Sequence, residues 1–225
     1  MSMPRPERVD IADEIYHIIN RANGRMQIFT KKEDYQLFEE LLQDAKEMTD
    51  MRIFAYCIMP NHFHLLLSPR RDGDLSLFMH WLTTTHTRRV HVNAKNIGAG
   101  HLYQGRYKSF LVDTDKYLLT LIKYIERNPV RAKLVRASEN WMWGSAWLRI
   151  SGNKAQKKLL DPSPTPFPHG YLNWINMLED KGDLMKIRNA VNRGTPYGRE
   201  KWVEQMVITH HLEATQRSQG RPRKQ

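Results

Sequence analysis

The chain has 225 residues, of which 40% are hydrophobic, and it carries a formal net charge of +11. This length suits one ordinary domain, or one domain with an extension. The apolar content is enough for a packed core, so the composition excludes a wholly disordered chain. A large positive charge favours a polyanionic partner, because each neutralised phosphate releases a counterion. Nucleic acid is therefore the first expected partner, ahead of an anionic membrane surface.

Cysteine content and hydropathy indicate the compartment. Cys57 is the single cysteine, so no intrachain disulfide can form, which fits a reducing environment. The N-terminus has no apolar stretch of the kind found in signal peptides, and no run approaches the roughly 18 apolar residues of a membrane span. The sequence predicts a cytoplasmic protein with no membrane partner.

Strand and helix patterns alternate over the first part of the chain. In chain order the sequence predicts a strand at 13–21, a helix at 32–48, a hairpin of strands 51–59 and 62–68, a helix from Asp74 to a glycine-rich loop at 96–100, and a strand at 107–112. A last helix runs from Tyr117 to about Arg127, where Pro129 stops it. The order β-α-β-β-α-β followed by α is that of the ferredoxin-like split βαβ plan, an α+β fold. We expect one antiparallel sheet with helices packed on one face.

The composition changes beyond residue 135, which divides the chain into a domain at 10–135 and a C-terminal extension at 136–225. The proline-rich segment 161–168 (DPSPTPFP) predicts a stiff, extended linker. A helical region is expected over 171–192. The tail at 220–224 is basic and is expected to be disordered.

Two histidines of the third predicted strand form the first candidate site. His62 and His64 are two residues apart, so both imidazoles point to one face of the sheet and Phe63 to the other. Neutral imidazole is a good ligand for divalent transition metals. Spacing alone still favours an ordinary pair of hydrogen-bonded sheet histidines. Three further histidines, at positions 80, 86 and 91, do not share one helical face and are expected to be solvated.

Tyr124 and Asn128 form the second candidate site. They are four residues apart near the end of the last predicted helix, so they share a helical face. Their positions alone favour a tyrosine ring in the core and an asparagine that ends a helix before Pro129. Tyr117, seven residues before Tyr124, shares this face and is expected to pack in the core.

Four linked motifs resemble one family. Residues 59–67 (MPNHFHLLL) are similar to the histidine–hydrophobic–histidine signature of single-tyrosine transposases, and residues 124–135 (YIERNPVRAKLV) to the tyrosine helix of the same family. Residues 16–21 (YHIINR) and 103–109 (YQGRYKS) match as well. The branch that the chain resembles is the REP-associated tyrosine transposases, relatives of the IS200-type elements. The resemblance covers roughly residues 10–135.

The resemblance implies a mechanism and a cofactor. His62, His64 and Asn128 are expected to hold a divalent metal, Mg²⁺ or Mn²⁺, that polarises the scissile phosphate. Tyr124 is expected to attack phosphorus and to become joined to the 5′ side of the cut, with a 3′-hydroxyl later reversing the step. The expected substrate is single-stranded DNA beside a hairpin formed by a short palindromic repeat. Relatives include monomers and also dimers that exchange the tyrosine helix, so a monomer and a homodimer both remain open.

Basic and aromatic residues near these motifs are candidates for DNA contacts. Phosphate contacts are expected from Arg21, Arg88, Arg89, Arg106, Lys108, Arg127 and Arg131. Tyr103 and Tyr107 alternate with Arg106 and Lys108, a pattern that suits stacking of unpaired bases. Taken singly, at least half of the cations are expected to be ordinary solvated charges, and Tyr103 equally fits the core face of a strand.

Two other functions fit part of the pattern. A non-catalytic ferredoxin-like protein that binds single-stranded nucleic acid shares the predicted topology, but such sheets depend on stacking aromatics where this chain has two histidines. A metal-dependent nuclease would hydrolyse DNA without a covalent intermediate. A protein–DNA adduct distinguishes the transposase from both.

Overall fold

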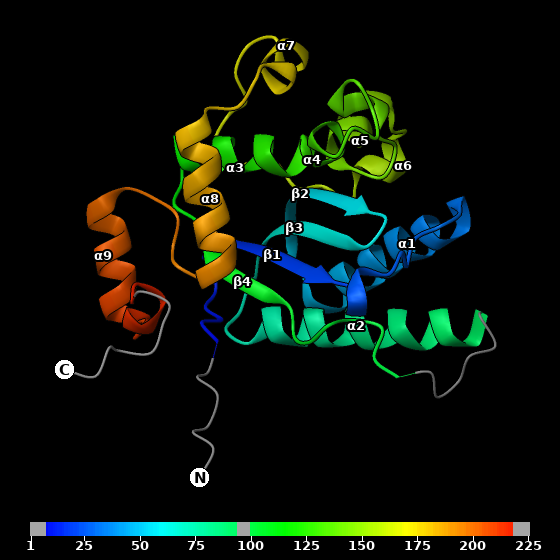
Figure 1. Cartoon of the computed structure of the whole chain (residues 1–225), viewed down its shortest axis with the longest axis horizontal. Coiled ribbons are helices and arrows are strands. Elements are labelled where there is room, and N and C mark those ends of the chain that lie inside the picture. Colours follow the sequence, from blue (N-terminus) through cyan, green and yellow to red (C-terminus); the bar gives the residue numbers. More distant parts are fainter. Residues whose placement is uncertain (1–7, 94–99, 218–225) are drawn as a thin grey trace.

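A four-stranded antiparallel sheet lies at the centre of the molecule (Figure 1). In this computed structural model, which describes residues 8–93 and 100–217, the strands are β1 (Tyr16–Arg21), β2 (Arg52–Met59), β3 (His62–Ser68) and β4 (Lys108–Leu111). Their order across the sheet is β2-β3-β1-β4. This is the order of the split βαβ plan, so the predicted α+β fold is confirmed. The basic tail at 220–224 and most of the predicted loop at 96–100 lie outside the described residues.

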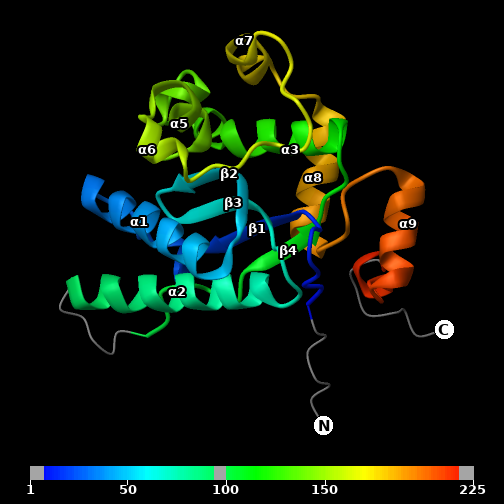
Figure 2. The same ribbon diagram turned by 180° about the vertical axis from the view of Figure 1, so that it is seen from behind.

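Helices cover both faces of the sheet (Figures 1 and 2). On one face, α1 (Lys32–Thr49) and α2 (Asp74–Asn93) pack against each other and share a hydrophobic core with Phe63, Leu65 and Leu67 of β3. On the other face, α3 (Lys116–Glu126) shares a second core with Leu66 of β3. The expectation of helices on one face is therefore wrong. The strands are apolar on both faces, so both faces must be covered to remove them from water.

The chain beyond α3 is mainly helical. Its elements are α4 (Asn128–Arg131), η2 (Ser138–Asn140), α5 (Ser145–Ser151), α6 (Lys154–Lys157), α7 (Tyr171–Asn176), α8 (Lys181–Arg193), α9 (Glu200–Thr209) and η3 (Glu213–Thr215), while the short turn η1 (Asn23–Arg25) follows β1. The predicted helical region at 171–192 is thus two helices. Nowhere in 8–93 or 100–217 does a helix combine the length and the apolar character needed to cross a membrane.

The extension covers both edges of the sheet. At the β2 edge, Ile58 N donates to Trp143 O at 2.9 Å, and Asp161 N donates to Ile53 O at 2.8 Å. At the β4 edge, Tyr197 N donates to the carbonyl oxygen at position 111 at 2.8 Å. Uncovered strand edges present unpaired backbone groups that invite association with other chains. The extension therefore completes the sheet that the first half of the chain builds.

The proline-rich segment is packed against the domain, contrary to the prediction of a linker. Its first residue, Asp161, accepts a hydrogen bond from Ile53 N at 2.9 Å and pairs with Lys46 at 2.7 Å. Near its end, the guanidinium carbon of Arg149 lies 4.6 Å from the centre of the Phe167 ring. The prolines keep the segment extended, and the side chains of Asp161 and Phe167 attach it to the rest of the chain.

His86 of α2 is buried in the first core, although the sequence predicted a solvated side chain. Its ring stacks on Phe29 with centroids 5.2 Å apart, and its Nδ1 lies 2.6 Å from the Tyr103 hydroxyl. Burial lowers the pKa of His86 from 6.5 to about 3. Below about pH 6.5 the unfolded chain therefore binds a proton that the folded protein excludes, so stability is full above this pH and falls as the pH decreases towards the folded pKa.

We expect His86 to contribute a loss of about 1.4 kcal/mol of unfolding free energy per pH unit below about pH 6.5. The measurement is urea denaturation at a series of pH values. His86→Phe removes the titrating group, so the plot of unfolding free energy against pH should become less steep by the contribution of one proton. His80→Gln, at an exposed position of the same helix, should leave this slope unchanged. An identical slope in His86→Phe and the parent protein would contradict the assignment.

Candidate active site

Three histidines meet on the face of the sheet that α3 covers. His62 and His64 alternate with Phe63 along β3, and their ring centroids are 5.1 Å apart, so the predicted common face is confirmed. His17 reaches the same face from the adjacent strand β1. Its Nε2 lies 2.9 Å from Nδ1 of His64, and both side chains are buried. His17 and His64 are 47 residues apart in the chain, and the register of β1 against β3 brings them together.

The hydrogen bonds of His62 and His64 leave one nitrogen of each ring for a ligand. Nδ1 of His62 lies 2.6 Å from Asn61 Oδ1, which only accepts, so this Nδ1 carries the hydrogen and Nε2 the lone pair. Nδ1 of His64 is occupied by His17, which leaves Nε2. Burial, with a smaller effect of Arg21, lowers the pKa of His62 to about 4, and burial also lowers the pKa of His64 well below its usual value. Both rings are therefore neutral near pH 7, the form that binds metals.

Tyr124 of α3 lies directly against these histidines. Its ring centroid is 5.9 Å from that of His64 and 6.4 Å from that of His17, and the ring is nearly perpendicular to both, at 84° and 79°. The residue is 8% exposed. Helical spacing places Leu121 and Ile125 on the same buried side of α3 as Tyr124. Their packing in the second core holds this side of the helix against the sheet. The structure thus brings the predicted nucleophile and the histidine strand of one chain together.

Asn128 stands at a break between two helices. α3 ends at Glu126, and α4 begins at Asn128 with Pro129 in its first turn, whereas the sequence predicted one helix to about Arg127. The amide Nδ2 of Asn128 faces the Tyr124 carbonyl oxygen at 3.4 Å, a weak contact. The amide oxygen is therefore the atom that Asn128 presents to a ligand.

Neutral imidazoles and amide oxygens are donors of the kinds that bind divalent ions. Among residues 8–93 and 100–217, no three or more His, Cys, Asp and Glu side chains are grouped so that they could hold a metal. A site at His62 and His64 therefore needs the Asn128 amide or water as a further donor. Nitrogen donors suit Mn²⁺ better than Mg²⁺, which prefers oxygen.

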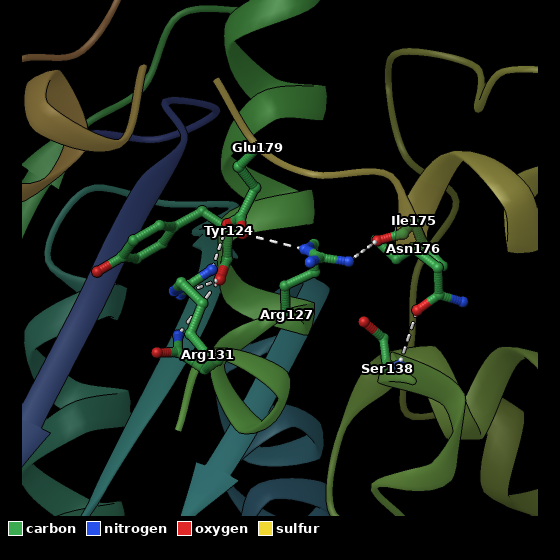
Figure 3. Close-up of polar contacts among 8 residues, drawn as sticks. Tyr124, Arg127, Arg131, Ser138, Ile175, Asn176 and Glu179 are labelled. Carbon is green, nitrogen blue, oxygen red and sulfur yellow. Dashed lines mark hydrogen bonds and ion pairs between the residues drawn. The ribbon is translucent and has the colours of Figure 1, made fainter. Parts of the chain in front are cut away.

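Glu179, which lies between α7 and α8, binds the two arginines that follow the tyrosine (Figure 3). Its carboxylate lies 3.0 Å from Nε of Arg127 and also pairs with Nη1 of Arg131. Both arginines were expected to contact phosphates, but their guanidinium groups are held in protein contacts. Glu179 was not predicted from the sequence, because 48 and 52 residues separate it from its partners and no local pattern marks it.

A second buried acid, Glu126, was also missed. It follows Tyr124 by two residues, and its side chain is 0% exposed. It accepts hydrogen bonds from Ser145 Oγ at 2.6 Å, Arg149 Nε at 3.2 Å and the Tyr171 hydroxyl at 2.6 Å. All three partners belong to the extension, which therefore neutralises a charge buried in the first half of the chain.

Basic residues line two adjoining cavities near the end of β1. The smaller, of about 330 Å³, has Arg21 and Lys108 in its wall. The larger, of about 760 Å³, follows α2 and includes Arg88, and Arg106 borders both cavities. Arg21 pairs with His62 in the register of β1 and β3, so this positive path leads towards the histidines.

Two other candidates for DNA contacts have different surroundings. Tyr103 is 7% exposed and directs its hydroxyl to His86, which makes it part of the first core. Its ring packs against Phe63 and His86, and the residue also belongs to the wall of the larger cavity. Arg89 is exposed on α2, beside Arg88.

Comparison with known proteins identifies the class and the family. The structure places two histidines of the sheet against a tyrosine on a helix. The model of the family described as "Transposase IS200 like" matches residues 11–128, which is over half of the chain. The chain belongs to the IS200-like transposase family.

Two relatives refine this comparison. A protein of Haemophilus influenzae, provisionally named a REP-associated tyrosine transposase, is 29% identical over 116 residues; the match covers 48% of this chain and 66% of that protein, just under two thirds of its length. A solved structure of a REP-associated tyrosine transposase bound to a REP hairpin is similar with a TM-score of 0.58 and 18% identity, over 79% of this chain and 93% of that one. The structural likeness supports the fold.

Proposed function

We propose that the chain is a metal-dependent transposase that cleaves and rejoins single-stranded DNA at hairpin-forming repeats through a 5′-phosphotyrosine intermediate. The observation that carries this proposal is the contact between the Tyr124 ring and His64, whose Nε2 is free for a ligand. Membership of a transposase family supports action on DNA. The REP hairpin in the related solved structure supports REP-like palindromes as the substrate.

The proposed chemistry assigns a role to each of these side chains. A divalent ion held by His62, His64 and Asn128, Mn²⁺ or Mg²⁺, would supply positive charge at the scissile phosphate. The Tyr124 hydroxyl oxygen forms a bond to phosphorus as the bond to the 3′ oxygen breaks. The 3′ oxygen ends as a hydroxyl, so it gains the proton that balances the one lost from tyrosine. A 3′-hydroxyl attacking the phosphotyrosine reverses these changes, so no nucleoside triphosphate is consumed.

The DNA is proposed to follow the positive path of the two joined cavities. Arg88 and Arg106 border the larger cavity, of about 760 Å³, which lies beside α2. Arg21 and Lys108 would then carry the strand towards the histidines. Arg89 is proposed to add a phosphate contact from the exposed side of α2. These contacts set the position of the DNA and supply affinity that weakens with salt.

One chain is proposed to contain a complete site. Tyr124 lies against His64 of its own chain, so no exchange of the tyrosine helix is needed to bring them together. Arg131 donates to the Tyr124 carbonyl oxygen at 2.6 Å and pairs with Glu179, which ties this helix to its own extension. The arrangement supports action by a monomer over a homodimer with exchanged helices.

The test is the formation of a denaturant-resistant protein–DNA adduct. Labelled single-stranded oligonucleotides that carry a hairpin are incubated with the protein and Mn²⁺, and the products are separated under denaturing conditions. We expect an adduct with the parent protein and none with Tyr124→Phe, because phenylalanine lacks the nucleophilic oxygen. The matched control is Tyr117→Phe on the same helix, whose ring packs against Tyr197 with centroids 5.3 Å apart.

Three outcomes would contradict the proposal, each in a different way. Cleavage with no adduct would indicate a nuclease that hydrolyses DNA directly. Hairpin binding with no cleavage would indicate a binding module. An adduct that persists in Tyr124→Phe would assign the nucleophile to another residue.

A further inference from the structure

A single guanidinium group contacts both the backbone and the ring of Tyr124. Nη2 of Arg131 donates to the Tyr124 carbonyl oxygen at 2.6 Å, and Cζ of Arg131 lies 4.2 Å from the centre of the tyrosine ring. This carbonyl is in the last turn of α3, where carbonyl groups lack their usual helical partners. Arg131 therefore restrains residue 124 at two points.

Glu179 in turn restrains Arg131. A long arginine side chain loses much rotamer freedom when it is fixed, so one contact to a carbonyl holds it weakly. The Glu179 side chain is only 8% exposed and forms ion pairs with both Arg131 and Arg127. Charge-assisted hydrogen bonds are shorter and stronger than neutral ones, and little water competes for them here. The direction of the Arg131 guanidinium thus depends on a residue of the extension.

The segment that carries Glu179 is itself anchored to the chain that follows α3. Arg127 Nη1 donates to Ile175 O at 3.2 Å, and Ser138 N donates to Asn176 Oδ1 at 3.0 Å (Figure 3). The amide of Asn176 also donates to Glu139 at 2.7 Å. These contacts fix the position of the Glu179 carboxylate relative to the chain that follows α3.

The restrained ring is the one that meets the histidines. Arg131 lies over the Tyr124 ring, while His64 and His17 lie near it at ring separations of 5.9 and 6.4 Å. Figure 3 shows the tyrosine side chain directed away from Glu179. A change in the position of Arg131 would therefore change the angle of the ring and the place of its hydroxyl relative to His64.

We propose that Glu179 is a positioning residue for Tyr124, which acts by holding Arg131 against the carbonyl and ring of the tyrosine. This inference rests on the proposed function, because it concerns the proposed nucleophile. Glu179 and Arg131 both lie outside residues 11–128, the part that matches the family model. The proposal therefore assigns a role in the reaction to the extension.

The first test separates the rate of the reaction from DNA binding in the full chain. Glu179→Ala should slow single-turnover adduct formation at saturating DNA and Mn²⁺ by about 10- to 100-fold, because a misplacement of about 1 Å costs up to this factor. Hairpin affinity measured without metal should change less than about threefold, since Glu179 lies outside the two cavities lined by Arg21, Arg88 and Arg106. The matched control is Glu204→Ala, which removes an exposed glutamate of α9 that contacts neither arginine. Its rate should match that of the parent protein.

The second test asks whether Glu179 acts through Arg131. If it does, Glu179→Ala should cause no further loss of rate in an Arg131→Ala background, whereas two independent effects would multiply. Glu179→Asp, which keeps the charge, should recover part of the rate that Glu179→Ala loses. Full multiplication of the two effects, or equal losses of rate and of hairpin affinity, would overturn the proposal.

A third readout needs neither DNA nor metal. With 3-fluorotyrosine at position 124, the fluorine NMR signal reports the surroundings of the ring directly. We expect the signal to move or broaden in Glu179→Ala and to stay in place in Glu204→Ala. An unmoved signal in Glu179→Ala would overturn the positioning role. Absence of an adduct with the parent protein would refute the proposed function instead, while this signal would still decide whether Glu179 positions the ring.

Discussion

Replacing His64 with asparagine is expected to slow DNA cleavage by about a thousandfold or more, because loss of several kcal/mol of charge stabilisation at phosphorus has this effect. The substitution keeps a polar atom near Nδ1, where the ring meets His17 at 2.9 Å, and removes Nε2. The variant should therefore fold and lose one metal donor. Mn²⁺ should raise the melting temperature of the parent protein and not that of the variant, since only a ligand that binds the folded state stabilises it.

Hairpin binding should survive this substitution. The proposed phosphate contacts come from Arg21, Arg106 and Lys108, so affinity measured in a chelator should change less than about threefold. His62→Ala provides a second variant, because His62 is less buried and does not contact His17. The exposed His169→Asn serves as the control and should leave cleavage unchanged. If folded His62 and His64 variants lost binding and cleavage equally, these histidines would be structural.

Deleting residues 136–225 is expected to abolish cooperative folding and to leave no active core. The deletion removes Ser145, Arg149 and Tyr171, the partners of the fully buried Glu126 carboxylate. Leaving a buried charge without its partners costs about 3–5 kcal/mol, a large share of the roughly 5–15 kcal/mol that stabilises a domain. The deletion also uncovers both edges of the sheet, which favours aggregation.

Circular dichroism and urea denaturation test this expectation. The matched control is a chain that ends at Arg217, which keeps all the contacts described and should unfold at the parent urea concentration. A double-mutant cycle of Glu126→Gln and Arg149→Met should give a coupling energy of about 1–3 kcal/mol. Cooperative unfolding of the 1–135 chain at the parent midpoint would contradict the expectation and would make residue 135 a true domain boundary.

Local patterns explain what could be predicted from the sequence. The strand at 62–68 was predicted with the bounds that the structure has, because alternation and the preceding turn are properties of neighbouring residues. The same alternation placed His62 and His64 on one face. The strands are apolar on both faces, which indicates that both faces are covered but not which helix covers each. The fold class could therefore be predicted while the packing of α3 could not.

Partners that are distant in the chain explain what could not be predicted. His17 meets His64 only because β1 lies next to β3 in a particular register. His86 was expected in solvent, but packing of α2 against α1 buried it beside Phe29. The positive charge of Arg131 suggested a phosphate contact. Only the fold shows that the guanidinium group of Arg131 pairs with the Glu179 carboxylate, 48 residues away in the chain.

The sequence by itself determined the order of the strands and helices, the common face of the two histidines and the class of chemistry that His62, His64 and Tyr124 suggest. These properties depend on periodicity over a few residues and on residue type. Only the tertiary structure decided that Tyr124 lies against the histidines of its own chain, and that the extension buries Glu126 and carries Glu179 to Arg131. Such contacts depend on packing between segments far apart in the chain, which no local pattern encodes.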